Sequence, residues 1–103
     1  MTRLVGLAVA LLVLVGCAAP GPKPTSTQEA FALMQSHMVE RYAACAGHMS
    51  NQTDGGVGCT AQGHLYIVYL VSDGQMPEIL EAMRTLHPTG TVSVDAPWLW
   101  VTE

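Results

Sequence analysis

Residues 64–71 read H-L-Y-I-V-Y-L-V, a stretch without Asp, Glu, Lys or Arg in which β-branched and aromatic side chains prevail. This composition predicts a β-strand. Both alternating sets of side chains are apolar, so we expect the strand at the centre of a sheet with both faces covered. Ser72-Asp73-Gly74 then ends the strand.

A helix is expected after this strand. Pro77 suits its first position, and Glu78 and Glu81 lie near its N-terminus, where negative charge is favourable. Its apolar face is formed by Ile79, Leu80, Met83 and Leu86. His87-Pro88 ends it.

Two short extended pieces, Thr91–Val94 and Trp98–Thr102, follow the helix and are separated by Asp95-Ala96-Pro97. They form either a tight hairpin or one kinked edge strand. The order strand, helix, strand predicts parallel strands side by side, joined by a right-handed crossover.

A longer helix is expected upstream of the central strand. Ser26 and Glu29 form a capping-box pattern, which predicts a helix from Thr27 to about Ala46. Its apolar stripe is Phe31, Met34, Met38, Tyr42, Cys45 and Met49. Residues 47–63 contain five glycines and no periodicity, which predicts a long loop.

The first residues have the features of an export signal. Met1-Thr2-Arg3 is a positive start, and residues 4–16 carry no charge. A helix of that length reaches about 20 Å, less than the hydrocarbon thickness of about 30 Å, so it is too short to span a bilayer comfortably. The segment therefore reads as the hydrophobic region of a signal peptide.

Leu14-Val15-Gly16-Cys17 resembles the lipobox of bacterial lipoproteins. The resemblance implies cleavage before Cys17, a lipid on its thiol, and acyl chains such as palmitate as the membrane anchor. It places the protein on the cell membrane or outer membrane, facing the periplasm or exterior. Ala18, where Asp would favour retention in the inner membrane, favours the outer membrane.

Three parts of the chain follow from these features: a signal peptide (1–16), a lipidated cysteine with a proline-rich tether (17–26) and one small domain (27–103). Pro20, Pro22 and Pro24 make the tether an extended spacer. The expected fold class is α+β, a helix–loop–β-α-β sandwich. The chain has four Lys and Arg residues against eight Asp and Glu, which disfavours nucleic acid as a partner. Removal of Arg3 changes the net charge from −4 to −5.

A disulfide is expected between Cys45 and Cys59, which stand at the two ends of the predicted loop. Lipidation of Cys17 leaves only these two thiols, and exported compartments are oxidising. Closing a loop of about 15 residues stabilises a fold by about 3 kcal/mol in the chain-entropy model.

Two metal sites are the alternatives. Zinc would use Cys45, His48, Cys59 and His64. Cu(I) would use Met34, His37, Met38, His48 and Met49. An exported cysteine pair is normally oxidised, and methionines on a helix stripe are usually core residues, so we predict no metal and no cofactor.

Trp98 and Trp100 share one face of their strand. They could stack on the sugar rings of a glycan, but a small domain needs bulky core residues, and we expect them in the core. No catalytic motif is present, so no enzyme is predicted. The expected function is a non-enzymatic envelope binding or accessory protein, anchored in the membrane, with an envelope protein as partner. A metal- or glycan-binding lipoprotein and an exclusion or immunity lipoprotein are the alternatives.

Overall fold

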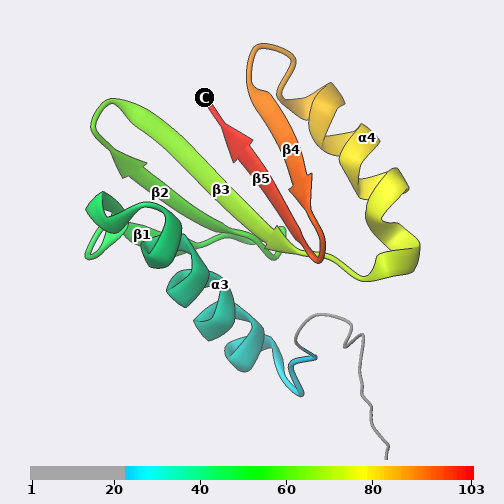
Figure 1. Cartoon of the computed structure of the whole chain (residues 1–103), viewed down its shortest axis with the longest axis horizontal. Helices are drawn as coiled ribbons and strands as arrows, with labels where there is room; N and C mark the ends of the chain where they lie inside the picture. Colours follow the sequence, from blue (N-terminus) through cyan, green and yellow to red (C-terminus); the bar gives the residue numbers. More distant parts are fainter. Residues whose placement is uncertain (1–22) are drawn as a thin grey trace, which may run out of the picture.

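A computed structural model describes residues 23–103 of the chain; the predicted signal peptide, Cys17 and most of the tether lie outside them. The fold is α+β, with two helices and a five-stranded antiparallel sheet of order β1-β2-β3-β5-β4 (Figure 1). Its elements are α3 (Thr27–Arg41), η2 (Ala43–Cys45), β1 (Met49–Asn51), β2 (Val57–Ala61), β3 (His64–Leu70), η3 (Asp73–Gln75), α4 (Met76–Leu86), β4 (Thr91–Asp95) and β5 (Trp98–Thr102).

Strand β3 occupies the centre of the sheet, as its sequence predicts. Val68 packs in a core layer beneath α3, together with Met34, Met38 and Trp100. Ile67 packs on the opposite face, in a layer with Met83 of α4. The two helices therefore cover opposite faces of the sheet, which explains why both sets of β3 side chains are apolar.

Helix α3 begins as predicted but ends at Arg41 instead of about Ala46. Tyr42 adopts an extended backbone, with φ −131° and ψ 91°, and a single 3-10 turn follows. In this position the Tyr42 ring stacks on that of Tyr66, with the ring centroids 4.1 Å apart. The 3-10 turn carries Cys45, whose sulfur is 2.06 Å from that of Cys59.

The prediction of a structureless loop over residues 47–63 is wrong. Strands β1 and β2 lie within it, and β2 pairs with β3 along its whole length, from Val57 opposite Val68 to Ala61 opposite His64. The disulfide therefore joins the end of the helical region to a sheet strand. Strand β2 is short, and its sequence alone gives little indication of a strand. Its conformation depends on pairing with β3.

The chain end forms the tight hairpin, one of the two predicted alternatives, with Asp95 opposite Trp98. The prediction of parallel strands side by side is wrong, because β5 lies between β3 and β4 and is antiparallel to both. Leu99, Trp100 and Val101 of β5 are at most 1% exposed. Burial of this apolar strand inside the sheet leaves the more polar β4 at the edge.

Candidate functional site

An open groove of about 680 Å³ lies between the N-terminal half of α3 and the loops at one end of the sheet. Phe31, Met34, Leu70 and Pro97 give it apolar walls, and Lys23 and Asp73 also line it. Its volume is within the range of ligand-binding clefts. A mainly apolar surface with few charges suits an uncharged, extended ligand better than a highly charged one.

The N-terminus of α3 forms one wall of the groove. The Glu29 N–H donates to Ser26 Oγ over 3.1 Å, which is the predicted cap. The Glu29 carboxylate, however, accepts from Thr25, from its backbone N–H at 2.9 Å and its hydroxyl at 2.7 Å, instead of from Ser26. These bonds lower the pKa of Glu29 and fix the direction of the chain next to Pro24, which lines the groove.

The end of β3 and the β4–β5 turn form the opposite wall. Leu70 is the last residue of β3, and it is only partly buried. The next residue, Val71, donates its N–H to the carbonyl oxygen of Pro97 over 2.8 Å. This bond places Pro97 beside Leu70 at the groove.

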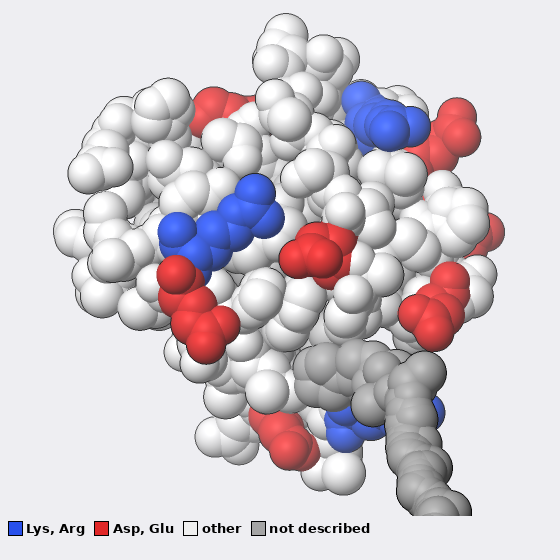
Figure 2. Space-filling model, viewed as in Figure 1, with Lys and Arg blue, Asp and Glu red and all other residues white. Residues whose placement is uncertain are grey.

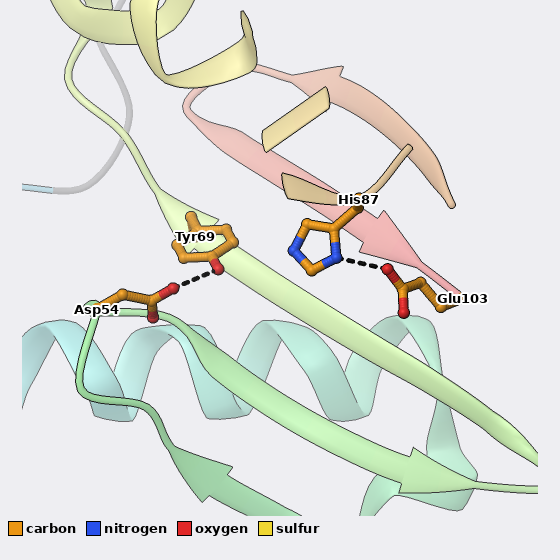
Figure 3. Close-up of polar contacts among 4 residues, drawn as sticks. All are labelled: Asp54, Tyr69, His87 and Glu103. Atoms are coloured by element: carbon orange, nitrogen blue, oxygen red, sulfur yellow. Dashed lines mark hydrogen bonds and ion pairs between the residues drawn. The ribbon is translucent and has the colours of Figure 1, made fainter. Parts of the chain in front are cut away.

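The β1–β2 turn reaches the groove through Gly55, whose φ of +98° favours glycine. Asp54 holds this turn because its carboxylate accepts the Gly56 N–H at 3.2 Å. The same carboxylate accepts the Tyr69 hydroxyl at 2.7 Å (Figure 3). Burial of Tyr69, together with the Asp54 hydrogen bond and charge, raises the pKa of the tyrosine well above its usual range. Three loops and one helix end thus build the groove.

The residues considered for zinc are not arranged as a metal site. The sulfurs of Cys45 and Cys59 bond to each other, so neither is a free thiolate. His48 is exposed, and the His64 ring lies 6.0 Å from that of Tyr66. Within residues 23–103, no three His, Cys, Asp or Glu side chains are grouped to hold a metal ion.

The residues considered for Cu(I) are divided between core and surface. Met34 and Met38 are 3% and 0% exposed and pack beneath α3, and Met49 packs against the same layer. His37 stacks on Trp98, with ring centroids 4.0 Å apart. These side chains serve as packing in the described part of the chain.

Trp98 and Trp100 lie on the α3 face of β5, where Trp100 is 1% exposed and belongs to the core. The Arg41 guanidinium lies over its ring, 4.5 Å from the centroid. Trp98 is partly buried and has His37 against one face. Trp100 is therefore a core residue, and His37 covers one face of the Trp98 ring.

Two histidine–carboxylate pairs stand away from the groove. His87 Nδ1 lies 2.5 Å from Glu103 Oε2 and ties the loop after α4 to the end of the described chain (Figure 3). His37 Nδ1 lies 3.4 Å from Glu40 on α3. Among residues 23–103, no hydroxyl or thiol is hydrogen-bonded to either histidine, so neither pair has the arrangement of a nucleophile and its base.

Of the residues that line the groove, the sequence singled out only Met34 for a candidate site, as a Cu(I) ligand, and it gave no indication of the groove. Phe31 and Met34 were expected on a buried helix stripe, and Leu70 in a buried strand. They meet at a groove because strand pairing brings the β3 end, the β4–β5 turn and the β1–β2 turn to the start of α3. Contacts between segments that lie far apart in the chain leave no local pattern in the sequence.

The groove lining carries charges of both signs, on Lys23 and Asp73. Figure 2 shows acidic and basic side chains dispersed over the visible face of the molecule. In the described part of the chain, no helix has the length and hydropathy needed to cross a bilayer.

Comparison of the chain with protein-family models, curated proteins and solved structures finds no match.

Proposed function

We propose that the protein is an exported lipoprotein, anchored through acylated Cys17, that binds an extended apolar segment of another envelope protein in the groove and catalyses no reaction. The observation that carries this proposal is the position of the groove: Lys23 and Pro24, where the tether joins the domain, form part of its lining. The binding surface is then at the anchored end of the domain, close to other membrane-attached proteins.

The chemistry of the groove supports a protein segment as ligand. Phe31, Leu70 and Pro97 are partly exposed and apolar, and an extended peptide with small or apolar side chains would cover them. Lys23, Thr27 and Asp73 provide donors and acceptors for the peptide backbone and fix its orientation. An interface of this size is small and fits a transient contact.

The test is capture in the native envelope followed by a groove-filling change. Thr27 is exposed and lines the groove, so Thr27→Trp fills the groove without opening the core. Ala82 is exposed on α4, and Ala82→Trp is the matched control. Loss of a captured partner with Thr27→Trp, and its retention with Ala82→Trp, supports the groove as binding site. Equal capture by both variants contradicts it.

A further inference from the structure

We propose that the groove is occupied, in the absence of a partner, by the chain's own residues 18–22 (Ala-Ala-Pro-Gly-Pro), so that the tether acts as a latch that a partner displaces. Docking of the tether in the groove does not depend on the proposed function. The role of the docked tether in excluding a partner does rest on that function.

The described chain begins on the groove. Lys23 and Pro24 both line it, followed by Thr27 at the start of α3. The two Thr25–Glu29 hydrogen bonds hold this entry in one direction. Residue 22 is therefore joined to a chain that already lies along the groove wall.

The composition of residues 18–22 fits the apolar groove. The segment has no charge and no long side chain, and Pro20 and Pro22 favour an extended polyproline conformation. Polyproline segments lose little entropy on binding and dock on apolar, aromatic-lined grooves. Phe31 and Pro97 supply such surface here.

The length is also sufficient. Five extended residues span about 15 Å. The groove follows α3 from Thr27 to Met34, which a helix covers in about 10 Å. Because the tether is covalently joined at the rim, its effective concentration is in the millimolar range, and a weak contact is enough to fill the groove.

The test compares two tethers on the soluble chain of residues 17–103 carrying Cys17→Ser. In one, residues 18–22 are native; in the other they are Gly-Ser-Gly-Ser-Gly, which lacks the apolar rings. Amide NMR shifts of Gly55, Val71 and Phe31 report on the groove, and those of Glu81 and Ala82 on α4 are the control.

We expect the groove amides to differ between the two tethers and the α4 amides to agree. In a Thr27→Trp background the groove is already filled, so the difference should vanish. Differences confined to residues 17–24, or differences that persist with Thr27→Trp, overturn the proposal.

A second measurement adds the synthetic peptide Ser-Ala-Ala-Pro-Gly-Pro, which corresponds to residues 17–22 with Cys17→Ser. It should bind the Gly/Ser-tether chain and shift the groove amides. If the native latch is closed nine-tenths of the time, the peptide binds the native chain about tenfold more weakly. Equal binding to both chains, or no binding to the Gly/Ser chain, overturns the latch. No membrane and no partner enters these experiments, so their outcome is separate from that of partner capture.

Discussion

At the residue scale, Tyr69 and Asp54 connect the sheet to the turn beside the groove. Tyr69 is 7% exposed, and its hydroxyl donates to Asp54, which also accepts the Gly56 N–H. The phenolate form would lie buried beside a carboxylate, so it is strongly disfavoured in the folded protein. Folding therefore keeps the proton on this tyrosine.

Stability should consequently fall at alkaline pH. The folded state has a raised Tyr69 pKa, whereas the unfolded chain loses this proton near pH 10. Above about pH 10 the unfolded state binds fewer protons than the folded state, so the free energy of unfolding decreases as pH rises. Melting temperatures measured from pH 8 to 11 should show this decrease, and Tyr69→Phe should reduce its slope. An identical slope in the variant contradicts the role of Tyr69.

The cap of α3 gives a second test at this scale. Ser26→Ala removes the oxygen that accepts the Glu29 N–H and should reduce the free energy of unfolding by about 1 kcal/mol. Ser36, exposed within α3, supplies the control. Ser36→Ala should leave stability unchanged or slightly higher, because Ala favours the helix. Urea denaturation of both variants measures the two changes in the free energy of unfolding. An equal loss in both variants would show that the Ser26 cap does not stabilise the helix.

At the element scale, local signals predicted some elements and missed others. The central strand and the starts of both helices were predictable, since an apolar run, a cap and a proline mark them. The end of α3 was not, because Tyr42 leaves the helix to stack on a residue of β3. Strands β1 and β2 were not, because they lie in the glycine-rich segment 47–63, whose composition suggests a loop unless the neighbouring side chains are known.

Two glycines of this region have such neighbours. A Cβ on Gly58 would lie 2.4 Å from Gln52 Nε2, and one on Gly56 would lie 2.6 Å from the Tyr69 ring. The sequence shows only that this segment is rich in glycine. The structure gives the reason at these two positions, where other side chains lie against the backbone. The groove was unpredictable for a similar reason, because three separate loops must meet to form it.

Gly56→Ala tests this account. The added methyl group displaces the Tyr69 ring and disturbs its bond to Asp54, so we expect a loss of about 1–3 kcal/mol in the free energy of unfolding. Gly74→Ala is the control, because a Cβ there meets nothing within 4 Å. It should be neutral or slightly stabilising. Chemical denaturation measures both, and a neutral Gly56→Ala would mean that the ring moves aside freely.

At the scale of the whole molecule, the disulfide joins the α3 side of the domain to the sheet. Cys45 and Cys59 are 0% and 1% exposed, and they lie 14 positions apart in the sequence. The double change Cys45→Ala, Cys59→Ala should lower the free energy of unfolding by about 2–4 kcal/mol. Denaturation of the wild type with and without reductant, beside the double variant, checks this. A reduced wild type as stable as the oxidised form contradicts it.

The proposed function requires a lipid anchor on Cys17, because the anchor would hold the groove close to other membrane-attached proteins. The direct test of the anchor is the intact mass of the protein extracted from membranes, measured before and after denaturing reduction and alkylation. We predict the mass of residues 17–103 plus acyl groups, with two alkylatable thiols that appear only after reduction. A chain that retains residues 1–16, or an unmodified Cys17 thiol, would contradict the account of a lipid-anchored binding protein.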